Sequence, residues 1–398
     1  MSSHYRARWV LPIDRPPIFD GWVRVAEGRI AGVGSGRPLA PAPLVEDLGD
    51  AAILPGLVNA HTHLELSWMA GHVPPAPSMD QWIRGLMGLR KQGAPGGADG
   101  ERAAALEAAR TMRATGTVLV GDISNSLLTP SVLAEVGLGG VVFHELIGFQ
   151  AKQPQAAVQL AWSRADQAEA ALPAGPRPPI GFSVVAHAPY SVSPTLFAEI
   201  VRSSRQTPLS IHLAESSEEM EFIRAGTGPI RDMIEFLGVW TDAWAVPGCE
   251  PDEYIGRVGY LRPGVLVVHG VHLTSGALER LRRAGAVLVT CPRSNLWVGA
   301  GSPHIAKFFA SGLPVALGTD SLASVATLNV FEELAEMRRL APEVAAGSLL
   351  ESATRVGAAA LGLGAEYGTI SAGKRAALIA VRVPAAVRDV EEYLVGGV

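Results

Sequence analysis

Two histidines separated by one residue, His61 and His63, have the types and spacing that suit metal binding. They follow the apolar residues 53–60, a stretch that favours a buried strand. Alternate side chains of a strand share a face, so both imidazoles would point the same way. Neutral imidazoles bind Zn²⁺ or Fe²⁺ at about 2.0–2.1 Å. The pair indicates a metal site, although two hydrogen-bonded histidines without a metal fit this short pattern equally well.

Other chemically active residues stand where further apolar runs end. His187, His212 and His269 each follow such a run, and Asp320 follows residues 314–317. Five of the 10 histidines therefore stand at predicted strand ends. In a barrel of parallel strands, reactive side chains gather at the C-terminal ends. The placement favours one shared metal site. We expect structural roles for four other histidines: His4, His72, His144 and His304.

The elements that must position these residues are eight apolar β-rich runs with helical stretches between them. The runs are residues 57–60, 117–120, 141–143, 182–185, 209–211, 265–268, 286–289 and 314–317. Expected helices are residues 100–114, 155–171, 218–222, 277–284 and 329–340, and the glycine-rich residues 93–100 are expected to form a loop. Eight βα repeats predict an α/β fold with a (β/α)8 barrel. An open doubly wound sheet fits the same periodicity less well.

Both ends of the chain differ from this central pattern. Short β segments broken by glycine and proline occupy residues 5–52, and residues 368–383 have the same character. Neither end has enough strands to bury a face alone, so we expect the termini to pair. The predicted domains are a small β-sandwich from residues 1–52 and 366–398, and a barrel from residues 53–365.

Composition limits the possible partners. The chain of 398 residues is 48% hydrophobic and 18% charged, with a formal net charge of −5. This charge gives no positive field to attract a phosphate backbone, so nucleic acid is a disfavoured partner and small molecules are favoured. The 2 cysteines, Cys249 and Cys291, fit a reducing compartment. No apolar run reaches the length of a membrane span, and we expect a soluble cytoplasmic protein without a membrane partner.

Several stretches, taken together, resemble the amidohydrolase superfamily, and within it the mononuclear deaminase and chlorohydrolase branch. The matching stretches are residues 55–63, 212–215, 268–270, 291–295, 317–321 and 373–374. The resemblance implies a barrel with a β-sandwich built from both termini. It also implies a metal site formed by His61, His63, His212 and Asp320, with Glu215 as a proton shuttle and His269 as a partner of the bound water.

The residue types support this chemistry. Three imidazoles and one carboxylate leave an ion with a residual positive charge and an open position. Water bound at that position has its pKa lowered towards 7 by the charge of the ion. Glu215 would protonate a substrate ring nitrogen, and Asp320 would carry a proton to the leaving amine. The alternative role for Glu215 is to cap the helix that follows. Binuclear members of the family that the chain resembles generally bridge two ions with a carboxylated lysine on strand four or an equivalent carboxylate. No lysine ends a predicted strand here, so the resemblance implies one Zn²⁺ or Fe²⁺ ion, and Glu145 is the residue that would bridge a second ion.

Substrate signals are weaker. Residues 187–191 resemble the strand-four motif of adenosine-type deaminases. Residues 61–67, followed by residues 80–83 and Arg90, resemble the aminodeoxyfutalosine deaminases of menaquinone biosynthesis. These likenesses imply a 6-aminopurine nucleoside substrate that contacts His187 and Arg90. Arg293 and Asn295 would bind a polar ligand or shape a turn. Trp68 and Trp82 would stack on a planar ring or cover apolar surface. A triazine or another nucleobase is the alternative substrate, and a non-catalytic binding protein is a remote alternative. A homodimer is possible in such barrels.

Overall fold

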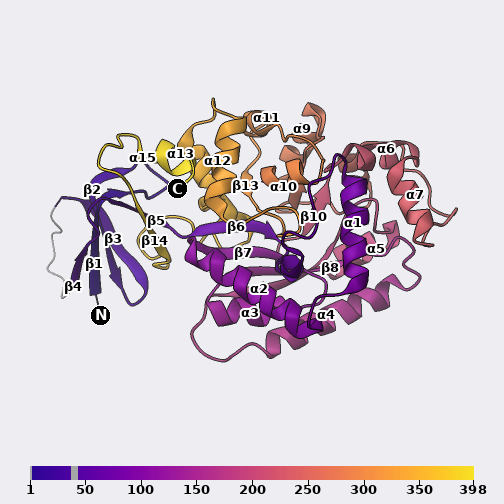
Figure 1. The fold of residues 1–398 in the computed structure, drawn as a ribbon, viewed down its shortest axis with the longest axis horizontal. Helices are drawn as coiled ribbons and strands as arrows, with labels where there is room; N and C mark the ends of the chain where they lie inside the picture. Colours follow the sequence, from indigo (N-terminus) through magenta and orange to yellow (C-terminus); the bar gives the residue numbers. More distant parts are fainter. Residues whose placement is uncertain (1, 37–43) are drawn as a thin grey trace.

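The computed structural model describes residues 2–36 and 44–398. A small β domain lies at one end of the molecule, and a larger α/β domain forms the rest (Figure 1). The chain starts in the β domain, crosses the α/β domain and returns, so elements from both termini lie near each other (Figure 1).

All eight predicted runs form parallel strands in two four-stranded sheets. One sheet has the order β6-β7-β8-β9 and the other β10-β11-β12-β13. The strands of the first are β6 (Leu57–Thr62), β7 (Thr117–Ser124), β8 (Gly139–Leu146) and β9 (Ile180–Ala186). Those of the second are β10 (Ser210–Leu213), β11 (Leu266–His269), β12 (Val287–Thr290) and β13 (Val315–Leu317).

Backbone contacts join the two sheets at both seams. The His212 N–H donates to the His187 carbonyl at 2.9 Å, between the ends of β9 and β10. At the other seam Thr62 forms a parallel bridge with Asp320, beyond β13. The fold is therefore the predicted (β/α)8 type, and both seams lie at residues that matter for chemistry.

Helices cover the outside of the strands (Figure 1). The predicted helices form as α2 (Gly97–Ala114), α4 (Pro154–Ala170), α6 (Ser217–Ala225), α9 (Ser275–Ala284) and α12 (Val330–Leu340). Other helices include α1 (Met79–Gln92), α3 (Thr129–Val136), α5 (Pro194–Ser203), α7 (Pro229–Phe236), α8 (Pro251–Arg257), α10 (Pro292–Trp297), α11 (Ile305–Ala310), α13 (Ala346–Ser352) and α14 (Arg355–Ala360). The expected loop at residues 93–100 is shorter, because α2 begins at Gly97.

Both termini build the small domain, as the sequence predicts. Its strands β1 (Ser2–Val10), β2 (Ile18–Ala26), β3 (Arg29–Ser35), β4 (Leu44–Asp47), β5 (Ala51–Pro55) and β14 (Leu378–Arg382) are hydrogen-bonded into one six-stranded sheet. The strand pairing of the expected β-sandwich therefore forms one continuous sheet. β5 continues past residue 52 to Pro55, and α15 (Val390–Val395) packs against α12 and α13 of the larger domain.

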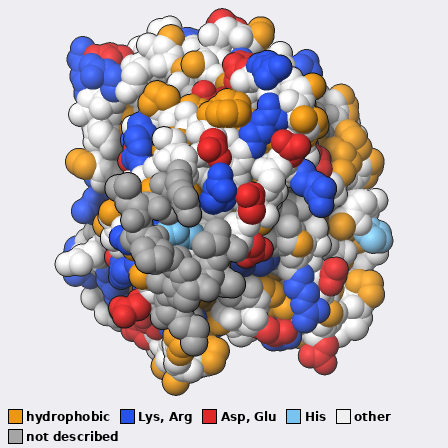
Figure 2. Space-filling model, turned by 90° about the vertical axis from the view of Figure 1, so that its left-hand side faces the viewer, with side chains coloured by type: hydrophobic (Ala, Val, Ile, Leu, Met, Phe, Trp, Pro, Cys, Tyr) orange, Lys and Arg blue, Asp and Glu red, His pale blue; other side chains and the backbone are white. Residues whose placement is uncertain are grey.

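The face of the molecule at the β-domain end carries interspersed charges of both signs (Figure 2). Among the described residues, no helix is both long enough and apolar enough to span a bilayer.

Candidate active site

The ends of the barrel strands bring four predicted metal ligands together. His61 lies within β6, His63 directly follows that strand, and His212 lies in β10. His63 Nε2 is 3.2 Å from His61 Nε2 and 3.3 Å from His212 Nε2. Asp320 Oδ1 lies 3.4 Å from His63 Nε2 and 3.7 Å from His61 Nε2. His63 Nε2 therefore lies within 3.4 Å of one donor atom of each of the other three residues.

The electrostatics of these side chains fit a divalent cation. Burial lowers the pKa of His61 well below its ordinary value, and lowers the pKa of His63 to about 3 and that of His212 to about 4. Neutral imidazoles with facing nitrogens present lone pairs that cannot all be satisfied by one another. The donor atoms of His61, His63 and Asp320 all lie within 4.8 Å of one another, as do those of His61, His212 and His269, a spacing that suits a divalent metal ion.

Neighbouring groups orient two of these ligands. His212 Nδ1 lies 3.0 Å from the His187 carbonyl, which leaves Nε2 to face the metal site. Ser294 Oγ and Ser324 Oγ donate to Asp320 Oδ2 at 2.5 and 2.9 Å, so Oδ1 remains for the metal site. Such supporting hydrogen bonds set the direction and basicity of metal ligands.

The backbone is strained at this end of the barrel. Ala214, His269 and Asp320 have positive φ angles of 50°, 73° and 62°. Non-glycine residues rarely adopt this left-handed region, and such strain concentrates at functional sites. The three positions follow or end β10, β11 and β13, where the chain must turn to aim side chains inward.

Glu215 lies beside the metal site with its carboxyl group buried. Its Oε1 is 3.5 Å from His269 Nε2. Burial, and secondarily the nearby Asp320 carboxylate, raises the pKa of Glu215 well above its ordinary value. The group is thus suited to carry a proton at neutral pH. Helix α6 is capped by Ser216, which accepts from the Glu219 N–H, so the alternative role of Glu215 as a cap is absent.

Glu219 is a supporting residue that we did not predict. Its buried carboxylate accepts hydrogen bonds from the N–H groups of Ala214 and Glu215, at 2.9 and 3.0 Å. It therefore fixes the turn that presents Glu215. Burial raises the pKa of Glu219 to about 7, against the effect of those two hydrogen bonds. The pattern Ser216-x-x-Glu219, a capping-box signature, was the available signal in the sequence.

A cavity of about 570 Å³ opens from the metal site. Its polar end contains His63, His212, Glu215, His269 and Asp320. Its outer wall is largely apolar and comes mainly from α1, the loop after β8, and α7 with the residues that follow it. These wall residues are Met79, Trp82, Ile83, Leu86, Met87, Ile147, Phe149, Met233, Ile234, Leu237 and Val239.

Two predicted substrate contacts, His187 and Arg90, line this cavity. His187 Nδ1 lies 2.7 Å from Ser191 Oγ, and burial lowers the pKa of the ring to about 4. The Arg90 side chain is 45% exposed, and its guanidinium lies 3.9 Å from Glu65 Oε1. Glu65, which we did not predict, is buried and accepts from the Ser124 and Ser126 hydroxyls. Arg90 thus has donors left for a ligand.

Glu145, the residue considered as a bridge to a second ion, also lines the cavity. Its Oε1 is 3.5 Å from His212 Nδ1, on the side of that ring away from His63. Its Oε2 accepts from Asn125 Nδ2 at 3.2 Å. Glu145 is therefore placed to support His212 rather than to join its metal-facing nitrogen.

Arg293 and Asn295 do not line the cavity, which corrects the expectation of direct substrate contacts. Arg293 forms ion pairs with Glu332 at 2.8 Å and Glu333 at 3.7 Å. Asn295 is fully buried, with Nδ2 3.0 Å from His269 Nδ1. The reason is that α10 begins at Pro292, so successive side chains point about 100° apart instead of together. Of the two tryptophans considered, Trp82 lines the cavity and Trp68 packs in an apolar cluster beside it.

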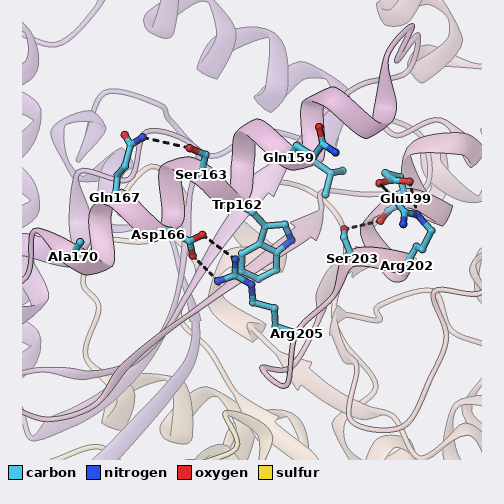
Figure 3. A pocket seen from close by; sticks show the side chains of 11 residues that line it. Gln159, Trp162, Ser163, Asp166, Gln167, Ala170, Glu199, Arg202, Ser203 and Arg205 are labelled. Atoms are coloured by element: carbon cyan, nitrogen blue, oxygen red, sulfur yellow. Dashed lines mark hydrogen bonds and ion pairs between the residues drawn. The ribbon is translucent and has the colours of Figure 1, made fainter.

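A second hollow lies between α4 and α5 on the outside of the barrel (Figure 3). There Arg205 stacks on Trp162, with 3.9 Å from the guanidinium carbon to the ring centre, and forms two hydrogen bonds with Asp166. Its charged groups pair with each other, as the dashed lines in Figure 3 show. No predicted site residue lies in it, so the chemistry belongs to the barrel cavity.

The chain is similar to deaminases of known name. It is 33% identical over 334 residues to the aminodeoxyfutalosine deaminase of Deinococcus radiodurans, covering 80% of this chain and 75% of that protein. It is 31% identical over 364 residues to a 5-methylthioadenosine/S-adenosylhomocysteine deaminase of Nitratidesulfovibrio vulgaris, covering 87% of this chain and 76% of that protein.

Solved structures show the same fold. Helicobacter pylori aminofutalosine deaminase, in complex with methylthio-coformycin, matches with a TM-score of 0.84 and 25% identity, over 98% of this chain and 95% of that one. A Xanthomonas campestris adenosine deaminase with bound zinc matches with a TM-score of 0.81 and 24% identity, over 99% of this chain and 89% of that one. The Amidohydrolase family model matches residues 52–393. The chain therefore belongs to the amidohydrolase family and is a hydrolase that acts on C–N bonds other than peptide bonds.

Proposed function

We propose that this enzyme hydrolytically deaminates a 6-aminopurine nucleoside, with release of ammonia, and that aminodeoxyfutalosine is its preferred substrate. The observation that carries the deaminase proposal is the buried Glu215 carboxyl between the converging ligands and the cavity. A carboxyl group that keeps its proton at neutral pH is what an attack on an aromatic C–N bond needs.

The roles of the residues follow from their positions. A divalent ion in the site of His61, His63, His212 and Asp320 would activate water at neutral pH. Glu215 donates its proton to a purine ring nitrogen as the neighbouring carbon is attacked. Asp320 accepts the proton of the attacking water and returns it to the departing amine. As ammonia leaves, the hydroxyl group on that carbon becomes the 6-oxo group and its proton returns to Glu215, so one water is consumed for each ammonia released.

The wall of the cavity supports a substrate larger than adenosine. Beyond the polar end, apolar side chains of α1 and α7 line the way out. Arg90 lines the same cavity, 3.9 Å from Glu65, with donors left for a ligand. An arginine in a largely apolar cavity fits a substrate that carries an aromatic carboxylate. Aminodeoxyfutalosine has such a benzoate group. The Deinococcus radiodurans relative supports the same substrate, and with it a role in menaquinone biosynthesis.

S-adenosylhomocysteine is the second candidate, favoured by the relative from Nitratidesulfovibrio vulgaris. Its carboxylate would also reach an arginine, but its ammonium group finds little to pair with on an apolar wall. 5-Methylthioadenosine has no carboxylate and would leave the remaining donors of Arg90 unused. A triazine is too small to use both ends of the cavity.

The test is ammonia release by purified enzyme loaded with Zn²⁺ or with Fe²⁺. The panel is aminodeoxyfutalosine, S-adenosylhomocysteine, 5-methylthioadenosine, adenosine and a chlorotriazine, with metal-free enzyme as the control. We expect the highest kcat/KM for aminodeoxyfutalosine. Faster hydrolysis of the triazine than of every purine nucleoside would contradict the proposal, and no turnover of any compound would favour the non-catalytic alternative.

A further inference from the structure

Two consecutive residues of α10 each hold one reactive group of the site. Ser294 Oγ donates to Asp320 Oδ2 at 2.5 Å, and Asn295 Nδ2 lies 3.0 Å from His269 Nδ1. Asn295 is fully buried and does not line the cavity. Within the part of the chain that the structure describes, its Oδ1 has no hydrogen-bond partner, so the bond to His269 is the polar interaction that this side chain makes there.

The direction of that bond determines the protonation pattern of His269. The Asn295 amide is placed with Nδ2 towards His269 Nδ1. Nδ2 has only protons to offer, so in this orientation His269 Nδ1 accepts with its lone pair. A neutral imidazole that accepts at Nδ1 carries its proton on Nε2. That nitrogen faces the site, 3.5 Å from Glu215 Oε1.

If Asn295 did not fix its tautomer, His269 could either ligate the metal or donate a hydrogen bond to water. Nitrogens of His61, His212 and His269 lie within 4.8 Å of one another, so His269 is close enough to act as a further metal ligand. A protonated Nε2 has no lone pair to give to a cation, but it can donate a hydrogen bond to water. The two tautomers therefore correspond to two different functions.

We propose that Asn295 is a positioning residue that holds His269 in its Nε2–H tautomer, so that His269 donates a hydrogen bond to the attacking water and does not ligate the metal. This inference rests on the proposed function for its catalytic part. Its structural part, the tautomer of His269, is independent of the substrate.

The first experiment measures the tautomer in the metal-loaded enzyme. In protein labelled with ¹⁵N-histidine, protonated and unprotonated imidazole nitrogens have separate chemical shifts, and the His269 signals are those lost in His269→Asn. We expect a protonated Nε2 and an unprotonated Nδ1. A protonated Nδ1 in the wild-type enzyme would overturn the proposal, whatever the substrate proves to be.

Two substitutions then separate positioning from packing. Asn295→Leu keeps the approximate size and removes the donor, while Asn295→Asp supplies only acceptors and should move the proton to Nδ1. We expect both to keep one metal per chain and to lose about 10–100-fold in kcat, with little change in KM. The matched control is Leu296→Ala on the exposed side of α10, which should behave as wild type.

The outcomes are distinct. A shift of the proton to Nδ1 in Asn295→Asp together with lost turnover supports the proposal. Wild-type kcat in folded Asn295→Leu overturns it, as does metal loss that accounts for the whole rate loss. If neither variant folds, the wild-type tautomer decides. An Nε2–H tautomer without activity on any purine nucleoside would reject the proposed function and leave the tautomer assignment intact.

Discussion

The polar and apolar ends of the same cavity are built in different ways. At the metal end, each reactive group has an identified neighbour: Ser294 holds Asp320, Glu219 holds the turn of Glu215, and Asn295 contacts His269. At the outer wall, side chains of α1 and α7 pack without such partners, and Ile147 and Leu237 remain 59% and 39% exposed. The chemistry is therefore fixed by hydrogen bonds at strand ends, and the choice of substrate by adaptable apolar surface. Substitutions at the two ends should have different kinetic effects.

The largest effect is expected for His212→Ala. The variant removes one of three converging imidazoles and leaves an incomplete coordination shell, so metal content should fall steeply and activity should fall to background. Elemental analysis after dialysis measures the first, and ammonia release the second. Undiminished metal content in a folded variant would remove His212 from the ligand set.

Glu215→Gln should keep the metal and lose most of the turnover. Glutamine has similar size and polarity but cannot deliver a proton, so we expect a loss of about 10²–10⁴-fold in kcat. Metal analysis and single-turnover kinetics on the same preparation separate the two effects. Wild-type turnover, or metal loss in proportion to the rate loss, would argue against a proton shuttle.

Arg90→Gln tests the contact proposed for the carboxylate of the substrate. Loss of a charge-assisted contact worth about 1.5–3 kcal/mol should raise KM for a carboxylate-bearing nucleoside by about 10–100-fold and change kcat little. KM for adenosine, which has no carboxylate, should not change. Arg84→Gln is the matched control, because Arg84 lies on the same helix, is half-exposed and faces Asp80. Equal effects of both substitutions would mean that Arg90 acts only through the helix.

Leu86→Ala should have a smaller effect on the same wall. Removing part of a half-buried apolar side chain loses contact area with the substrate, and we expect KM to rise by about two- to tenfold. A kcat loss that exceeds the KM change would show that the wall also orients the reacting ring, and the two ends would then not be separable.

The last prediction concerns stability and pH instead of kinetics, away from the cavity. Burial raises the pKa of Glu333 to about 8, despite the nearby Arg293. The folded state therefore favours the protonated form, and this stabilisation is complete below pH 4.5 and is lost as pH rises through about 8. As the pH rises from 5 to 8, the free energy of unfolding in urea should fall less for Glu333→Gln than for the wild type. Parallel curves for the two proteins would contradict the raised pKa.

Sequence patterns predicted the metal end well and the outer wall poorly. His61, His63, His212 and Asp320 follow strands with strong β periodicity, and the C-terminal ends of barrel strands meet by geometry. Helix α1, which supplies much of the wall, contains residues 80–83 and Arg90 of the deaminase resemblance, but it was not among the predicted helices. Which of its side chains face the cavity depends on how α1 packs, and local sequence does not specify that packing.

Supporting residues were missed for a related reason. Glu65 and Glu219 lie close in sequence to His63 and Glu215, but their hydrogen bonds depend on the folded turns. Arg293 and Asn295 were placed near the site correctly and given the wrong kind of contact, because a helix starting at Pro292 directs one outward and one inward. A position at a strand end therefore predicts proximity, whereas the contact itself depends on the element that follows.

The most direct test of the account is a steady-state comparison of the metal-loaded and metal-stripped enzyme on aminodeoxyfutalosine, with metal content and ammonia measured in the same samples. The account predicts ammonia release in proportion to bound metal, up to one ion per chain, and a return of activity when Zn²⁺ or Fe²⁺ is added back. Ammonia release that does not depend on metal content, or fully loaded enzyme that leaves every purine nucleoside unchanged, would contradict it.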